Sequence, residues 1–440
     1  MHVLTGLKSF LRIMPEDDVP PRVALHFKHN FTVNLLDSSI WMFGDSFASV
    51  VTIIPVFIAT LTDSPIIIGL VPALLNAGWF LPQMFMAGIV QRRTKKMPLA
   101  KLMGLLERVP YFFFPLLAFL LPKMTKSTVL WIYIALTVWR GIATGLVALP
   151  WQEVIATVIP LSHRGRFFGM SRLAGQILGV IGSAIAAVVF NRFDYPYNYA
   201  VSFLICMVAL WFSYVFFIMN IEPEPELPSV LEVQKLESPK TALIDWAAFG
   251  RILKNDINFR YYLGSRSLTF IGNMASGFLA VYGIQKFNLS DDQAAIFTGL
   301  LFLSGVFGYA LWGLIGDRIG PKRIILISGL IWIAALMFAI MSPVIWLYYA
   351  VFLLMGFSSA GSILGDIVLV MELGDDARRP TYLGLARTLP GVFLLIAPLF
   401  AGWVVSLSGY PLMLGLTIVF TALGLLMLIK VKDRPRIVRH

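Results

Sequence analysis

Ionisable side chains stand inside the apolar stretches of this sequence, where a charge is costly. On insertion scales, an ionised side chain at the centre of a bilayer costs about 2.5–3.5 kcal/mol. The cost is tolerated where the residue faces water or an opposite charge, so such residues are candidates for binding protons or polar solutes and for forming ion pairs. The acids are Asp37, Asp45, Glu107, Glu153, Asp366 and Glu372, and the bases are Lys101, Arg108, Arg140, Arg172, Arg260, Arg266 and Arg387.

Asp45 and Arg140 lie deep in their apolar stretches. At ~1.5 Å per residue, Asp45 is ~20 Å along the first stretch and Arg140 ~18 Å along the fourth, so both are predicted near the membrane midplane. One interpretation makes Asp45 a proton-coupling carboxylate, because burial and a nearby arginine change an acid's proton affinity in opposite directions. The other interpretation is a fixed ion pair that holds the helices together. The sequence leaves both open.

Other polar side chains are further candidates for binding protons or polar solutes. Arg108 follows Glu107 directly, and adjacent residues on a helix point ~100° apart. We therefore predict that the two side chains do not face each other and that each finds a partner on another helix. Asn76, Gln176 and Asn273 carry amides inside apolar stretches, and a buried amide either binds a solute or joins two helices.

Histidine and cysteine are placed where they support neither metal nor redox chemistry. The five histidines lie outside the apolar stretches, and the one cysteine, Cys206, forms no intrachain disulfide. The sequence contains no Gly-Lys dipeptide and therefore no Walker A loop. We expect no cofactor, no metal site and no direct use of ATP by this chain.

The apolar stretches are the elements that must position these residues. The chain has 440 residues, 58% hydrophobic and 13% charged, with a mean hydropathy of +0.80, whereas a soluble domain has about 25% charged residues. A spanning helix needs about 20 apolar residues, and we predict twelve. The expected fold is an all-α integral membrane protein with twelve transmembrane helices in two pseudo-symmetric six-helix bundles.

The polar stretches divide this fold into segments. The linker between the bundles includes residues 241–254, whose apolar side chains have the spacing of an amphipathic helix on the membrane surface, although a solvated turn is the alternative. The predicted segments are a cytoplasmic N-terminal segment (1–30), a first bundle (31–220), a cytoplasmic linker (221–258), a second bundle (259–429) and a basic cytoplasmic tail (430–440).

Basic residues predict the orientation. Most of the 35 Lys and Arg residues fall in segments on one side of the predicted membrane, and cytoplasmic loops carry such an excess. Both termini are therefore predicted to be cytoplasmic. The net charge of +11 follows from this topology, so we expect contact with membrane lipid rather than with nucleic acid.

The two halves also share a repeat. Gly44-Asp45 in the first predicted helix matches Gly272-Asn273 in the seventh at an offset of 228 residues. Internal repeats of this kind are typical of transporters, whose substrate sites lie between the repeats. Asn273 is thus the counterpart of Asp45 in the second half.

Gly313-x3-Asp317-Arg318-x-Gly320 lies between the eighth and ninth predicted helices and resembles the loop signature of the major facilitator superfamily. Arg164, after the fourth helix, and Glu372-x6-Arg379, after the tenth, are similar to further signatures of that family. After the second helix, Arg92 stands where the family has an aspartate. The resemblance implies that the first and fourth helices line a central cavity, which would place Asp45 and Arg140 on the substrate path.

A cytoplasmic latch is expected where charged residues gather near the cytoplasmic helix ends. Its ion pairs would form when the pore faces outward and break when the pore opens inward. For Arg172 and Arg387, simple extension of the side chain to the interface is an equal alternative. The predicted latch residues are Asp317, Arg318, Arg164, Glu372, Arg379, Glu153, Arg172 and Arg387.

These observations predict a secondary active transporter and not an enzyme. We expect it to move a small solute by alternating access, coupled to protons, as a monomer in the plasma (inner) membrane. The alternatives are an uncoupled facilitator, a membrane-embedded transferase, and a transporter-like sensor or lipid scramblase. The short predicted loops disfavour the transferase, since the only histidine among them is His163.

Overall fold

The computed structural model describes residues 19–224, 246–373 and 379–432, and these residues fold into helices. The helices are α2 (Pro21–Asp45), α3 (Ile53–Leu61), α4 (Pro65–Gln91), α5 (Met97–Arg108), α6 (Pro110–Leu120), the short 3-10 helix η2 (Leu121–Lys123), α7 (Lys126–Val158), α8 (Leu161–Arg192), α9 (Tyr197–Ile218), α11 (Trp246–Asn255), α12 (Ile257–Ile271), α13 (Leu279–Phe287), α14 (Gln293–Ile319), α15 (Pro321–Met341), α16 (Ile345–Leu373) and α17 (Arg379–Ile429).

Nine stretches of the described chain are long and apolar enough to cross a membrane. One of them, Leu389–Ile429, covers two helices that meet at Gly409. The φ of Gly409 is +79°, a conformation that glycine adopts readily and that is strained for other residues. The pairs α2–α3 and α12–α13 are each divided by a non-helical segment. The arrangement is consistent with the predicted twelve helices.

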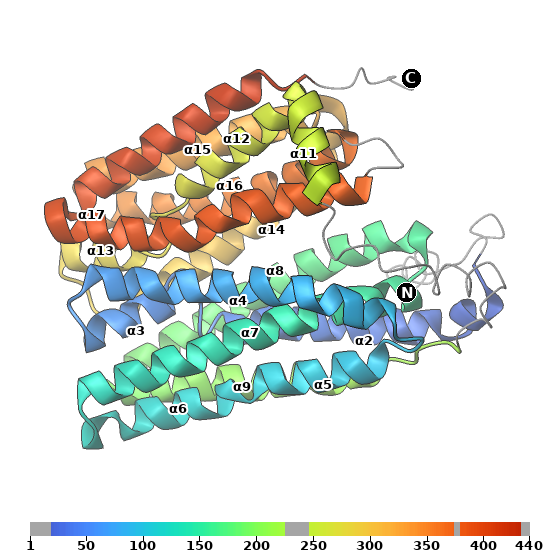
Figure 1. Cartoon of the computed structure of the whole chain (residues 1–440). Helices are drawn as coiled ribbons and strands as arrows, with labels where there is room; N and C mark the ends of the chain where they lie inside the picture. The colour runs from blue at the N-terminus through green and yellow to red at the C-terminus, as the bar shows by residue number, and fades with distance from the viewer. Residues whose placement is uncertain (1–18, 225–245, 374–378, 433–440) are drawn as a thin grey trace, which may run out of the picture.

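The two halves pack in the same pattern, as the predicted repeat requires. In the first half, α2 packs against α9 while α7 packs against both α4 and α5. In the second half, α12 packs against the last part of α17 while α16 packs against both α14 and α15. Figure 1 shows the first half, in blue and green, below the second half, in yellow to red. The all-α fold of two pseudo-symmetric bundles is confirmed.

Both halves interrupt their first helix at the repeated motif. Residues 46–52 separate α2 from α3, and residues 272–278 separate α12 from α13. Gly, Ser, Asp and Asn have weak helix propensity, which suits the break that follows Gly44-Asp45 and Gly272-Asn273. Side chains satisfy the freed backbone carbonyls, as a break inside a membrane requires: the Ser202 hydroxyl donates to Phe47 O at 2.7 Å, and Trp332 Nε1 donates to Gly272 O at 2.7 Å.

The halves meet along two helix pairs, α4 with α17 and α8 with α14. They are held most closely at the end of the molecule where α3 and α13 lie, at the left of Figure 1, which we call the α3 end. There the buried hydroxyls of Thr52 and Thr298 hydrogen-bond across the halves. Tyr199, fully buried in the first half, donates to Asp291 Oδ2 of the second half at 2.9 Å.

The hydrophobic clusters show that the opposite end, the α11 end, is divided. One large cluster at the α3 end includes residues of both halves, among them Phe57 and Phe278. Toward the α11 end each cluster stays within one half: one lies around Phe27 in the first half, and two lie around Tyr262 and Trp312 in the second. Phe85 of α4 is 70% exposed and Leu314 of α14 is 77% exposed. The halves are therefore joined at the α3 end and apart at the α11 end.

The linker is described at its two ends only. Its acidic beginning contacts the first half, where the Glu222 carboxylate accepts the backbone N–H of Lys96 at 2.7 Å and of Met97 at 2.9 Å. Its last part is α11, and Ile252 of this helix is buried against the second half. Residues 241–245 of the predicted amphipathic helix lie outside the described part, as do residues 1–18 and 433–440 of the predicted terminal segments.

Candidate functional site

Asp45 and Arg140 lie together, as their predicted depths suggested. Asp45 is the last residue of α2, directly before the helix break, and its Oδ1 is 3.8 Å from Arg140 Nη2 of α7. The Asp45 side chain is 38% exposed and that of Arg140 is 10% exposed. The Arg140 guanidinium lies 5.0 Å from the centre of the Tyr111 ring. The carboxylate is therefore the member of the pair that water reaches.

Asn273, the counterpart of Asp45, lies in the α12–α13 break and is exposed. It lines a small cavity of about 30 Å³ together with Asn76 of α4, between the two halves. The Asn76 amide also donates to Leu394 O of α17 at 3.1 Å. Of the two roles open to a buried amide, Asn76 thus joins two helices, whereas Asn273 presents its side chain to open space.

Gln176 lies where α8 meets α14 and is not open to water. It is 9% exposed, and within the described part of the chain its Oε1 atom has no hydrogen-bond partner. A Cβ atom added at Gly305 of α14 would lie 2.5 Å from this oxygen. Gln176 therefore fills a tight contact between the halves.

Arg108 is buried inside the first half rather than beside the cavity. Its Nη1 lies 3.2 Å from Glu107 Oε2, so the prediction that these neighbours do not face each other is wrong. Both side chains are long enough to bend together although their Cα–Cβ bonds diverge. The other part of the prediction holds, since Arg108 Nη2 also lies 3.9 Å from Asp37 of α2.

The residues predicted to form a latch are found near the α11 end, and their gating role stays a prediction. Arg164 donates from Nε to Ile159 O at 3.1 Å and from Nη2 to Ala156 O, so it binds carbonyls at the end of α7. Glu372 is half-buried, and Glu153, Arg172 and Arg318 are exposed. The side chains of Asp317, Arg379 and Arg387 lie outside the described part.

A second arginine–aspartate pair in the other half was not predicted. Arg266 Nε of α12 lies 2.8 Å from Asp366 Oδ1 of α16, and the Tyr262 hydroxyl donates to the same oxygen at 2.7 Å. The pair joins the first and fourth helices of the second half, just as Asp45 and Arg140 do in the first half, with acid and base exchanged. A signal was present in the sequence, because both residues had been recognised as charges inside apolar stretches.

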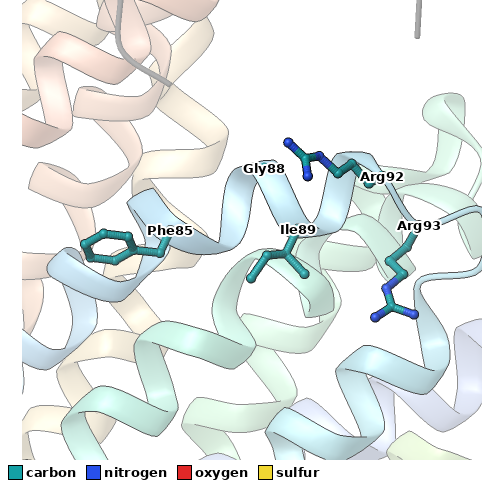
Figure 2. Close-up of a pocket in the computed structure, with 5 residues that line it drawn as sticks. All are labelled: Phe85, Gly88, Ile89, Arg92 and Arg93. Carbon is teal, nitrogen blue, oxygen red and sulfur yellow. The ribbon is translucent and has the colours of Figure 1, made fainter. Parts of the chain in front are cut away.

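A larger hollow of about 490 Å³ lies beside the α11 end of α4. Phe85, Gly88, Ile89 and Arg92 follow one another at helical spacing along its wall, with Arg93 next to them (Figure 2). This is the segment in which Arg92 replaces the signature aspartate. It contains none of the residues predicted for the substrate path.

Among the described residues, no three His, Cys, Asp or Glu side chains are grouped so as to hold a metal ion.

Comparison with known proteins agrees with this architecture. The family model described as Major Facilitator Superfamily matches residues 36–308 and 262–440. No curated protein sequence matches the chain significantly. The solved structures with a similar fold have low sequence identity to this chain, so the similarity supports the fold alone.

Three of these structures cover nearly the whole chain. The nucleoside transporter NupG, as a variant, has a TM-score of 0.69 at 14% identity over 91% of this chain and 99% of its own. A D-xylose-proton symporter has a TM-score of 0.67 at 16% identity, covering 92% and 98%. A bacterial homologue of the iron transporter ferroportin, in an inward-facing state, has 0.65 at 14% identity, covering 92% and 98%.

Proposed function

This chain belongs to the Major Facilitator Superfamily, and from that premise we propose that it is a proton-coupled secondary transporter of a small polar solute. It is a multi-pass membrane protein of a transporter family. The solute binds near the membrane midplane between the two halves, which rock about their contact to expose the site to each side in turn. The α11 end is the cytoplasmic end, and the form with this end open is the inward-open form.

One observation carries the proposal: a carboxylate at the helix break is open to water while its arginine partner is buried. Asp45 is within 3.8 Å of Arg140 and keeps 38% of its side chain exposed. Water and the guanidinium both favour the charged carboxylate, and removal of either favours the protonated acid. Rocking of the halves changes the water around Asp45, so it couples proton binding to the state of the cavity.

The choice of a small polar solute follows from the groups near Asp45. Asn273 is exposed on the opposite half and Asn76 lines the same small cavity. Amides offer both donors and acceptors to hydroxyl-rich or heterocyclic solutes. The similar structures are named for a nucleoside, D-xylose and iron, and the neutral amides favour the first two kinds of solute over a metal ion.

An uncoupled facilitator is the second candidate, and the ion pair itself favours it. If Asp45 and Arg140 stay paired in every state, they brace α2 against α7 and no proton is exchanged. Such a protein equilibrates its solute across the membrane without concentrating it.

The test combines a ligand screen with flux in liposomes. Sugars, nucleosides and organic ions are first screened for a rise in the melting temperature of the purified protein. A solute that raises it is then offered to proteoliposomes with and without an imposed pH step. We expect the pH step to drive accumulation in the wild type, and Asp45→Asn to abolish accumulation while the folded yield and solute binding survive.

The matched control is Asp63→Asn, which neutralises an exposed acid at the α3–α4 turn. This variant should accumulate the solute as the wild type does. Accumulation by Asp45→Asn at the wild-type level would refute the assignment of Asp45. A wild type that only equilibrates its solute, with or without the pH step, would establish the facilitator instead.

A further inference from the structure

Two carboxylates share a single arginine inside the first half, at a place that the substrate path does not use. Asp37 of α2 is 5% exposed, and Glu107 and Arg108 of α5 are each 4% exposed. Arg108 lies 3.2 Å from Glu107 and 3.9 Å from Asp37. We call Asp37, Glu107 and Arg108 the buried triad.

The Arg108 guanidinium is held in place from all sides. It lies 4.9 Å from the ring centres of Trp41 and Tyr214. It donates from Nε to Leu210 O at 3.1 Å and from Nη1 to Gly104 O at 3.0 Å. Two of its N–H groups are thus directed to backbone carbonyls, so a single well-formed charge contact, to Glu107, remains for two acids.

The charges of this region do not balance when all its acids are ionised. The triad carries two carboxylates and one guanidinium. The nearest further pair, Asp45 with Arg140, adds one charge of each sign, so the wider group still has one excess negative charge. An uncompensated charge away from water is strongly unfavourable, and a buried acid is neutralised by taking up a proton.

Among the described residues, the remaining neighbours supply no second positive charge of their own. Asp37 Oδ1 accepts the Ser213 hydroxyl at 2.6 Å, and Trp151 also neighbours this carboxyl. Glu107 has Thr144 and Arg140 as its other electrostatic neighbours. Arg140 is the partner of Asp45, and the others are neutral.

We infer that the buried triad holds one proton at neutral pH, shared between the carboxyls of Asp37 and Glu107. The proton comes from water and binds one carboxylate, which becomes a neutral acid, while the other carboxylate stays ionised beside Arg108. The triad is a proton-binding site separate from Asp45. Its role as a store for the coupling proton rests on the proposed function, whereas the presence of the proton does not.

The direct test is infrared spectroscopy of the purified full-length protein at neutral pH. A protonated carboxyl has a C=O stretching band that is separate from the carboxylate bands and shifts in heavy water. We expect this band in the wild type and its loss in both Asp37→Asn and Glu107→Gln, because each variant leaves one carboxylate for one guanidinium. Asp63→Asn, the exposed control, should keep the band. A wild type without the band, or a band that survives both triad variants, would overturn the inference.

Melting temperatures give a second readout that needs no transport. Asp37→Asn and Glu107→Gln, each of which removes the excess charge, should melt within a few degrees of the wild type, and their stability should depend less on pH. Arg108→Gln should melt markedly lower, because it leaves two carboxyls without the guanidinium. If Arg108→Gln does not fold, the two acid variants and the infrared band still decide the matter.

A bound cation is the competing explanation, and the same measurements separate it. If the wild type lacked the carboxyl band and its melting temperature rose with sodium concentration, while Glu107→Gln lost this dependence, the excess charge would be balanced by a metal cation and the proton would be excluded. Failure of proton-driven accumulation in liposomes, with the band present, would refute the proposed function and leave the triad proton intact.

Discussion

At the residue scale, the aspartate is more exposed to water than the arginine in both arginine–aspartate pairs. Asp45 is 38% exposed against 10% for Arg140, and Asp366 is 27% exposed against 10% for Arg266. Each arginine also lies against an aromatic ring, Tyr111 or Phe270. The broad, weakly hydrated guanidinium tolerates such burial better than a carboxylate does. Both halves therefore present the acid of the pair to water.

Asp291, in the loop before α14, gives a prediction about pH. Burial raises the pKa of this carboxyl above that of an ordinary aspartate; the hydrogen bond from Tyr199 opposes the rise, and neighbouring Asp292 adds to it. The folded protein binds this proton more tightly than the unfolded chain does. Protonated Asp291 therefore makes its whole contribution to the stability of the fold below the ordinary aspartate pKa. The contribution is lost as the pH rises through the raised value.

We therefore expect Asp291→Asn to flatten the pH dependence of the melting temperature above the ordinary aspartate pKa. Between the ordinary aspartate pKa and the raised pKa of Asp291, the wild type should lose stability as the pH rises. The variant should lack the part of this loss that comes from Asp291. Asp63→Asn is the control, since Asp63 occupies the equivalent turn in the first half and is exposed. Identical pH profiles for Asp291→Asn and the wild type would show that the contact with Tyr199 does not bury a titrating group.

At the element scale, glycines let α4 and α17 approach closely across the two halves. A Cβ atom added at Gly69 would lie 2.2 Å from Pro398 O, a backbone atom that cannot swing aside. Gly402 meets Pro65 O in the same way, at 2.5 Å. The small residues thus fix the distance between the halves near the α3 end, as is common for helices in membranes.

Gly69→Ala is therefore expected to lower stability, although alanine favours a helix. Overpacking costs typically about 1–3 kcal/mol, which exceeds the gain of up to about 1 kcal/mol from the better helix former. Gly415→Ala is the matched control, because nothing lies within 4 Å of a Cβ atom at that helical position. The melting temperature of purified protein should fall for the first variant and stay or rise for the second. Equal values would show that α4 and α17 adjust freely.

The broken helices are the other elements that matter for function. Each break lies beside the polar residue of the repeat, so Asp45 and Asn273 are placed where the backbone itself is polar. At the α12–α13 break, Gly272 O accepts both Trp332 Nε1 and the Thr421 hydroxyl, at 2.7 and 3.1 Å. These bonds hold the break in one conformation without closing it into a helix.

At the scale of the whole molecule, the halves are joined at the α3 end and apart at the α11 end. The shared hydrophobic cluster and the Thr52–Thr298 hydrogen bond lie at the joined end. The proposed alternating access requires this junction to open when the α11 end closes. A covalent bond across the junction should therefore hold the transporter in its present form.

We expect Thr52→Cys with Thr298→Cys to form a disulfide on mild oxidation and to stop solute flux in proteoliposomes. A reductant should restore the flux. The background is Cys206→Ser, because Cys206 is the one cysteine of the chain and is buried. Each single cysteine variant in that background is a control and should be insensitive to oxidation. Undiminished flux in the oxidised double variant would mean that the halves need not separate at the α3 end.

The sequence by itself determined the membrane class, the repeat and the depth of the charges. Apolar stretches of about 20 residues leave little choice but helices that satisfy their own backbone in lipid. The equal depth of Asp45 and Arg140 followed from counting residues along these stretches, and the structure places the two side chains 3.8 Å apart. Such properties are local, because they depend on composition and on the rise of a helix.

Only the tertiary structure decided which charged side chains share a partner and which polar side chains are exposed to water. Depth does not say which way a helix face points, so Arg266 and Asp366 were recognised separately and not as a pair. The contact of Glu107 with Arg108 depends on how long side chains bend between α2, α5 and α9. The sequence also does not determine which end of the molecule is open. A transporter that works by alternating access must be able to open at either end with the same sequence, so only the packing of the halves distinguishes the inward-open form from the outward-open form.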